Sequence, residues 1–173
     1  MELAFIIDNI SRAILMIYNY NMMGRAKGGS VTDELWEKYR RPDRRDSLSS
    51  RGLSTIKVLL VEDSDDLRVL YNAFFKILGI KVDNASDGLK ALEMITEKNY
   101  DIVFMDIQLP GLNGDKVVAK VRELGKTVPV VALTARALLE EKVQYLNGGF
   151  SGYISKPFGI DDISSIIEEV LSV

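Results

Sequence analysis

Segments typical of β-strands alternate with segments typical of amphipathic helices five times from residue 56 onward. The strand segments are short and apolar, whereas apolar residues in the helical segments recur at intervals of three and four. Such alternation requires right-handed crossovers, which build a parallel sheet with helices on both faces. We therefore predict an α/β fold with a doubly wound, five-stranded parallel sheet. The expected strands cover 56–61, 80–85, 102–105, 128–133 and 152–154, and the expected helices cover 65–78, 87–98, 115–124, 136–147 and 161–173.

Acidic residues stand where two of the expected strands end. Glu62 and Asp63 follow the first strand, and Asp106 ends the third, which is an uninterrupted apolar run. In a doubly wound sheet of order 2-1-3-4-5, the first and third strands flank the point where such sheets bind ligands. We therefore expect the three acids in one crevice, with Thr134 and Lys156 on its rim.

These acids predict a metal site. Three carboxylates close together repel one another and raise each other's pKa unless a cation neutralises them. The chain has no histidine and no cysteine, and oxygen ligands alone favour a hard cation, Mg²⁺ or alternatively Mn²⁺. The same absences exclude disulfides and mean that any step using a histidine needs a partner's residue.

Residues 1–55 differ from the rest of the chain in charge and pattern. They carry nine Lys/Arg and seven Asp/Glu, a net charge of +2, whereas the remainder carries 13 and 18, a net charge of −5. Apolar spacing over residues 3–18 predicts an amphipathic helix. Residues 40–51 contain five arginines, followed and interleaved by serines, which is typical of a solvated linker. We predict a helical extension with a basic Ser/Arg-rich linker over 1–55 and a folded domain over 56–173.

The amphipathic helix of the extension has three open interpretations: packing on its own domain, a dimer seam, or a membrane-surface helix. Its stripe slightly favours self-association and hence a homodimer. Asp8, Asn9 and Arg12 lie inside the segment and weigh against a membrane span. No aromatic residues are interleaved with the linker arginines, so nucleic-acid binding is not expected. The lack of cysteine suits a cytoplasmic location.

The strand-end residues resemble those of response-regulator receiver domains of two-component (His-Asp phosphorelay) signalling, which are chemotaxis-regulator-like and flavodoxin-like in fold. The resemblance covers residues 56–173 and none of the first 55. Two positions depart from the usual pattern: Glu62 replaces a commoner Asp, and Leu109 stands where Met is frequent. Neither change removes an acceptor or a charge. The matching segments are 61–63, 105–114, 133–135 and 153–158.

The resemblance implies a phosphoacceptor chemistry. Asp106 would attack a phosphohistidine on a histidine kinase or histidine phosphotransfer protein. Mg²⁺ would be held by Asp63, Asp106 and the backbone carbonyl of Gln108, with Glu62 acting through water. Lys156 would offset charge on a phosphoryl oxygen as a point charge. The chain would be a phosphoacceptor with weak autodephosphorylation, not a dedicated enzyme.

The resemblance also implies a switch. Thr134 would donate its hydroxyl to the new phosphoryl group, and Tyr153 would turn from exposed to buried. This would bias a two-state equilibrium and alter the surface on which a downstream protein target docks. Gln108 and Arg136 occupy positions that tune the phosphoryl lifetime in the family.

The same sequence is compatible with two other functions. The chain could be the receiver end of a hybrid histidine kinase, with residues 1–55 as linker. It could also be a receiver-like binding module that signals without phosphorylation. A Mg²⁺-dependent phosphatase is disfavoured because Gln108 stands where its motif has a second acid, and nucleotide binding because no Gly-rich loop follows the first strand.

Overall fold

The computed structural model describes residues 55–135 and 145–171. They belong to the unit Ser54–Val173. The amphipathic helix and the basic linker predicted within residues 1–55 therefore lie outside the described residues, apart from Thr55 at the boundary.

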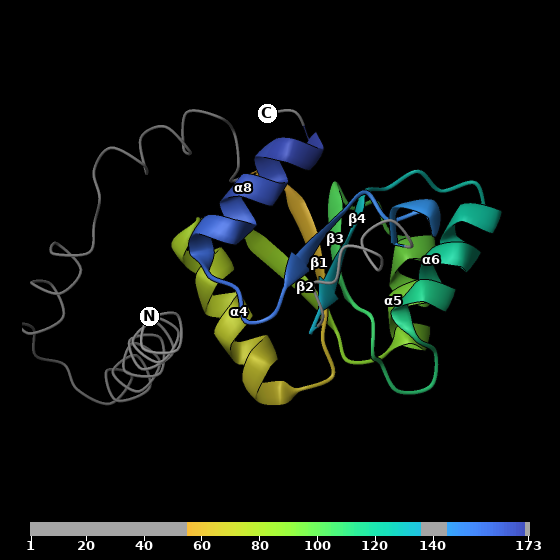
Figure 1. The fold of residues 1–173 in the computed structure, drawn as a ribbon, viewed down its shortest axis with the longest axis horizontal. Helices are drawn as coiled ribbons and strands as arrows, with labels where there is room; N and C mark the ends of the chain where they lie inside the picture. The colour runs from red at the N-terminus through yellow and green to blue at the C-terminus, as the bar shows by residue number, and fades with distance from the viewer. Residues whose placement is uncertain (1–54, 136–144, 172–173) are drawn as a thin grey trace, which may run out of the picture. The chain divides into compact units, whose positions relative to one another are not determined.

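The described residues form one five-stranded parallel sheet with strand order β2-β1-β3-β4-β5 (Figure 1). The doubly wound order predicted from the sequence is thereby confirmed. Since β1 and β3 are neighbours while β2 lies at one edge, the chain reverses its winding direction after β2. The strands are β1 (Lys57–Val61), β2 (Lys81–Ala85), β3 (Ile102–Asp106), β4 (Val130–Thr134) and β5 (Gly152–Ser155).

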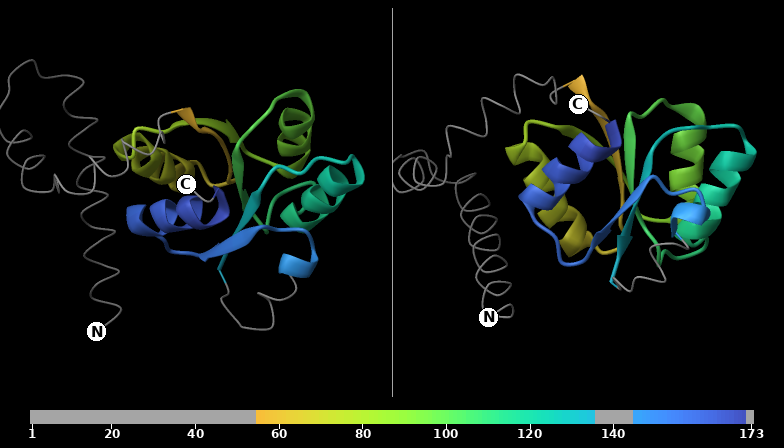
Figure 2. Two further views of the ribbon diagram at one scale, coloured as in Figure 1. Left: turned by 90° about the horizontal axis from the view of Figure 1, so that it is seen from above. Right: turned by 45° about the horizontal axis from the view of Figure 1, so that its top comes forward.

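Helices cover both faces of the sheet. In Figures 1 and 2, α4 and α8 lie on one face, and α5 and α6 lie on the other. Their bounds are α4 (Asp65–Ile77), α5 (Gly88–Glu97), α6 (Gly114–Glu123) and α8 (Ile160–Leu171). The helix expected at 136–147 is described only over 145–147, which are helical. None of the described helices is long and apolar enough to cross a membrane.

Local sequence signals explain where the helices begin and end. The Ser64 side chain accepts a hydrogen bond from the backbone N–H of Leu67 at 3.4 Å and caps α4. Asp87 caps α5 in the same way, accepting from the N–H of Lys90 at 2.8 Å. Such caps satisfy backbone donors that the first turn leaves without a helical partner. Gly79, with φ of 76°, follows the C-cap of α4 in the left-handed conformation that glycine tolerates best.

The side chains of each strand alternate between two buried faces. Leu59 and Val61 of β1 and Met105 of β3 pack in a cluster with residues of α5 and α6. We call this side the α5/α6 face. On the other side, Phe104 of β3 meets Phe75 of α4 edge-on, with ring centroids 5.1 Å apart. We call this side the α4/α8 face. Burial on both sides is what the uninterrupted apolar runs predicted.

Candidate functional site at the carboxyl edge of the sheet

Asp106 is the last residue of β3 and is paired with Leu133 of β4. The residue is 8% exposed, and its carboxylate accepts a hydrogen bond from the backbone N–H of Gln108 at 3.0 Å. Because Met105 faces α5 and α6, alternation directs the Asp106 side chain towards the α4/α8 face. The sequence predicted a strand over 102–105 with Asp106 directly after it. In the structure Asp106 is the last residue of the strand and pairs with β4.

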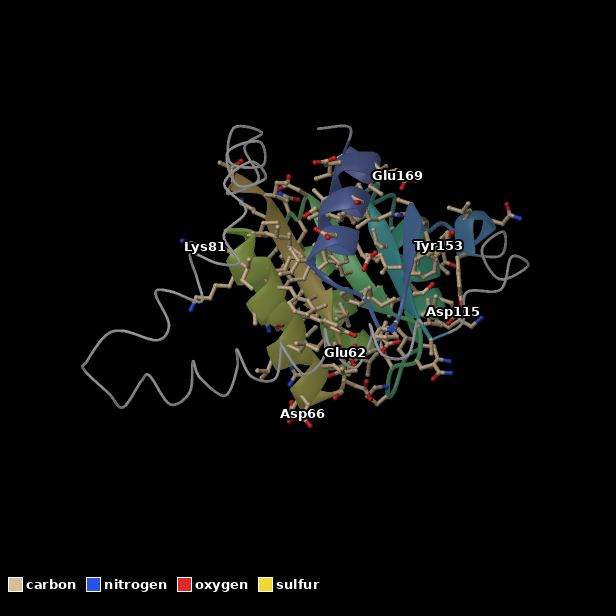
Figure 3. All side chains as sticks on the ribbon, turned by 60° about the vertical axis from the view of Figure 1, so that its left-hand side comes forward. Glu62, Asp66, Lys81, Asp115, Tyr153 and Glu169 are labelled. Carbon is tan, nitrogen blue, oxygen red and sulfur yellow. The ribbon has the colours of Figure 1, made fainter. Side chains whose placement is uncertain are left out.

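Glu62 and Asp63 follow β1, the strand adjacent to β3. Glu62 is almost fully buried at 1% exposure, whereas Asp63 is exposed. The backbone N–H of Ser64 donates to Glu62 Oε1 at 3.3 Å. Figure 3 shows Glu62 at the edge of the sheet near Asp66, which lies in the first turn of α4.

The three predicted acids are brought together at this edge. One carboxylate oxygen from each of Glu62, Asp63 and Asp106 lies within 4.8 Å of the other two. The donors are all oxygens and come from the ends of two neighbouring strands. This donor set fits a hard divalent cation such as Mg²⁺, which favours carboxylate ligands and retains water.

Lys156 lies between two of these acids. Its ammonium Nζ is 2.6 Å from Glu62 Oε2 and 2.6 Å from Asp106 Oδ2. Its backbone N–H donates to the carbonyl of Thr134 at 2.7 Å, which anchors the residue beside the end of β4. The side chain is only 16% exposed. The sequence predicted Lys156 on the rim of the crevice, and the structure places its charge inside.

Burial and the opposite charge of the neighbouring group have opposing effects on the pKa values of Glu62 and Lys156. Burial is the main cause that raises the pKa of Glu62, and the hydrogen bond and charge of Lys156 oppose it without cancelling it. Burial alone would lower the pKa of Lys156, but its hydrogen bonds to Asp106 and Glu62 outweigh that effect, so its pKa is raised. The ammonium therefore remains charged beside the two acids at neutral pH.

Thr134 and Tyr153, the two predicted switch residues, lie on β4 and β5. Thr134 is buried at 5% exposure, and its hydroxyl is 3.3 Å from the Tyr145 hydroxyl. Tyr153 is half-buried and packs against the cluster on the α5/α6 face. In Figure 3, Tyr153 lies on β5 at a distance from the edge of the sheet where Glu62 is found. The family roles of both residues stay predictions.

The two residues predicted to tune the phosphoryl lifetime are placed only in part. The Gln108 side chain is exposed and its backbone N–H faces Asp106, while the metal-ligand role of its carbonyl stays a prediction. Arg136 lies outside the described residues.

Sequence reasoning missed residues that support the site from α4. Arg68 donates from Nη1 to the carbonyl of Glu62 at 2.7 Å, and its Nη2 pairs with Asp65. Tyr71 stacks on Phe158, with ring centroids 4.1 Å apart and planes 16° apart. The three-residue spacing of Asp65 and Arg68 could have suggested a helical pair. The Tyr71 contact depends on tertiary packing, so the sequence carried no signal for it.

The described domain matches a known family. The family model of the response regulator receiver domain covers residues 58–168. The transcriptional regulatory protein TcrA of Mycobacterium tuberculosis is 33% identical over 111 residues, which are 64% of this chain and 44% of that protein. This chain therefore matches less than half the length of that relative.

Two solved structures are similar over the same region. The receiver domain of the sensor histidine kinase PA1611 from Pseudomonas aeruginosa, with a magnesium ion in its active-site cleft, is 32% identical, with a TM-score of 0.62 over 68% of this chain and 98% of that chain. The receiver domain of Ssk1 from Saccharomyces cerevisiae, solved with the histidine phosphotransfer protein Ypd1, is 28% identical. Its TM-score is 0.64 over 68% of this chain and 89% of that chain.

Proposed function

The chain belongs to the response regulator receiver domain family of two-component signalling, and from this we propose that Asp106 is the residue that accepts the phosphoryl group. The single observation that supports the assignment best is the Lys156 ammonium, 2.6 Å from both Glu62 and Asp106. A phosphoryl group bound to Asp106 would carry negative charge. The largely buried ammonium of Lys156 lies where it could offset that charge.

The proposed transfer requires little covalent work from the protein. An Asp106 carboxylate oxygen attacks the phosphorus of a partner's phosphohistidine, so that a P–O bond forms and the P–N bond breaks. The imidazole nitrogen leaves with the electron pair and takes up a proton. Because the chain has no histidine, the donor must belong to a histidine kinase or a histidine phosphotransfer protein. Lys156 stabilises the charge of the transferred group through a preorganised contact.

The acid cluster is the proposed Mg²⁺ site, and Mn²⁺ would suit the same oxygen donors. Asp63, Asp106 and the backbone carbonyl of Gln108 would hold the ion, with Glu62 acting through water. The ion would supply positive charge to the phosphoryl oxygens. The chemistry of the donor set supports this assignment, as does the magnesium bound by the PA1611 receiver domain.

The proposed output is a conformational switch. Thr134 donates its hydroxyl to the phosphoryl group, and Tyr153 becomes more buried, which changes the surface offered to a downstream protein target. Gln108 and Arg136 tune the lifetime of the phosphoryl group, which the domain loses by weak autodephosphorylation. A cytoplasmic location and a homodimer through the N-terminal helix stay predictions.

A second candidate is the receiver end of a hybrid histidine kinase. The PA1611 receiver domain, which belongs to a sensor histidine kinase, is 32% identical to this chain and covers 68% of it. The phosphoacceptor chemistry is the same in both cases, and the difference lies in which histidine supplies the phosphoryl group. A binding module that signals without phosphorylation has no such supporting observation.

The test is phosphoryl transfer to the purified chain. With Mg²⁺ and either acetyl phosphate or a panel of phosphorylated kinases, the unsubstituted chain should gain one phosphoryl group that is labile to alkali and hydroxylamine, measured by intact-mass spectrometry or radiolabel. Asp106→Asn should gain none under the same conditions. Equal labelling of both proteins would refute Asp106 as the acceptor, and no labelling of either would favour the phosphorylation-independent module.

A further inference from the structure

Tyr145 contacts the residue on which the proposed switch depends. Its hydroxyl lies 3.3 Å from Thr134 Oγ1, and either atom can donate the hydrogen. The Tyr145 ring is held in place by an edge-on contact with Phe150, with ring centroids 5.8 Å apart and planes at 72°. Phe150 is itself buried at 5% exposure. The contact with Phe150 therefore orients the Tyr145 ring so that its hydroxyl lies beside that of Thr134.

The contact lies on the side of the sheet away from the reactive carboxylate. Ala132 belongs to the cluster on the α5/α6 face, so alternation along β4 directs Thr134 to the same face. Tyr145 packs against that cluster as well. Asp106 and Glu62 follow residues that face α5 and α6, so alternation directs their side chains to the α4/α8 face.

We propose that Tyr145 is a positioning residue that holds the Thr134 hydroxyl in its resting place and thereby opposes phosphorylation. This inference rests on the proposed function, in which Thr134 donates to the phosphoryl group on Asp106. To do so, the Thr134 hydroxyl turns towards the edge of the sheet and breaks its hydrogen bond with the Tyr145 hydroxyl. A contact present in only one of two states shifts the equilibrium between them by its own strength.

The sequence did not indicate this contact, because a spacing of eleven residues between Thr134 and Tyr145 corresponds to no known motif. Tyr145→Phe removes only the hydroxyl and keeps the ring on Phe150. A neutral hydrogen bond contributes a net factor of about 2 to 12 to an equilibrium constant. Removing it should therefore favour the phosphorylated state by a factor in that range.

The experiment measures the apparent Kd of beryllium trifluoride, a phosphoryl mimic, for the full chain with saturating Mg²⁺ by two-dimensional NMR. Tyr145→Phe should bind about twofold to tenfold more tightly than the unsubstituted chain. In a Thr134→Val background the same substitution should change nothing, because the competing contact is already absent. Tyr100→Phe is the matched control, since it removes a hydroxyl that bonds Asp83 at 2.8 Å and does not involve Thr134.

The outcomes separate this inference from the proposed function. Unchanged or weaker binding by Tyr145→Phe, or an equal change in both backgrounds, would overturn the restraining role while leaving the phosphoacceptor intact. An equal gain in Tyr100→Phe would also overturn it. If the unsubstituted chain shows no saturable binding, the proposed function fails and this inference fails with it.

Discussion

At the scale of single residues, the site is defined by one cation shared between two acids. Lys156 contacts Glu62 and Asp106 at equal distances, and both acids are buried. Removing a partner from such a set leaves an uncompensated buried charge, which costs more than the pair contributes when intact. The most informative titrating group is Glu62, because its burial outweighs the attraction of Lys156 and raises its pKa.

The raised pKa of Glu62 predicts a pH-dependent stability. The folded state binds this proton more tightly than the unfolded state, whose carboxyl titrates near 4.5. The resulting stabilisation is fully present below that pH and is lost as pH rises through the folded-state pKa. Each unit of pKa shift corresponds to about 1.4 kcal/mol.

Glu62→Gln tests this directly, because glutamine resembles the protonated acid. In chelator-treated buffer, urea unfolding should show the unsubstituted protein losing stability relative to Glu62→Gln as pH rises from about 4.5 towards neutrality. A constant difference between the two proteins over that range would mean that the Glu62 pKa is not raised in the folded state.

At the scale of elements, the connection between β3 and α6 holds Asp106 through a very close backbone approach. A Cβ atom added at Gly114 would lie 2.2 Å from the carbonyl oxygen of Asp106 and 2.9 Å from Met105 Cγ. The Gly114 N–H donates to the carbonyl of Ile107 at 3.0 Å, which closes the turn. No side chain fits there unless the end of β3 shifts.

Gly114→Ala should therefore destabilise the domain by about 1–3 kcal/mol, the usual cost of forcing extra atoms into a packed site. Gly159→Ala is the matched control, since its added Cβ would meet nothing closer than Asp162 Oδ2 at 3.9 Å. That control should change the free energy of unfolding by less than about 1 kcal/mol. Equal effects of the two substitutions in denaturant unfolding would contradict the close approach at Gly114.

At the scale of the whole molecule, the sheet brings residues from four strand ends to one edge. The alternation of strands and helices, together with the continuous apolar runs of buried parallel strands, predicted a parallel sheet. The particular order 2-1-3-4-5 is one of the two common doubly wound orders and is the order of the family that the strand-end residues resemble. The acids and Lys156 could be placed at one edge for the same reason. Tyr71 and Tyr145 could not be placed, because the contacts of Tyr71 with Phe158 and of Tyr145 with Thr134 depend on how side chains of different elements pack.

Boundaries were predicted less well than elements. From the sequence we predicted that the third strand ends at residue 105 and the fourth at residue 133. Each prediction stopped one residue short, because Asp106 and Thr134 are polar and polar residues are typical of the start of a loop. Both are instead the last residues of their strands, since a ladder needs only backbone donors and acceptors. The depth of Lys156 was also beyond prediction, because it depends on the backbone contact between Lys156 and Thr134.

Cation binding should stabilise the whole fold. If Mg²⁺ binds the acid cluster only in the folded state, a concentration 100-fold above its Kd adds about 2.7 kcal/mol to the free energy of unfolding. Thermal unfolding of the unsubstituted chain should therefore shift upward on addition of Mg²⁺, and Asp63→Asn should lose most of that shift. Asp115→Asn is the control, because this exposed acid on α6 is not part of the cluster. An equal shift in Asp63→Asn and Asp115→Asn would place the ion elsewhere.

The ammonium and the buried glutamate that meet at this edge are separated by 94 positions along the chain. Lys156 directly follows β5, which is the last strand in sequence order within the described sheet and pairs with β4. A ribosome-bound or proteolytically shortened fragment without that strand keeps its aspartate but has no ammonium next to it. We therefore expect a fragment that ends before β5 to accept a phosphoryl group poorly, because Lys156 contributes the ammonium that contacts both Glu62 and Asp106.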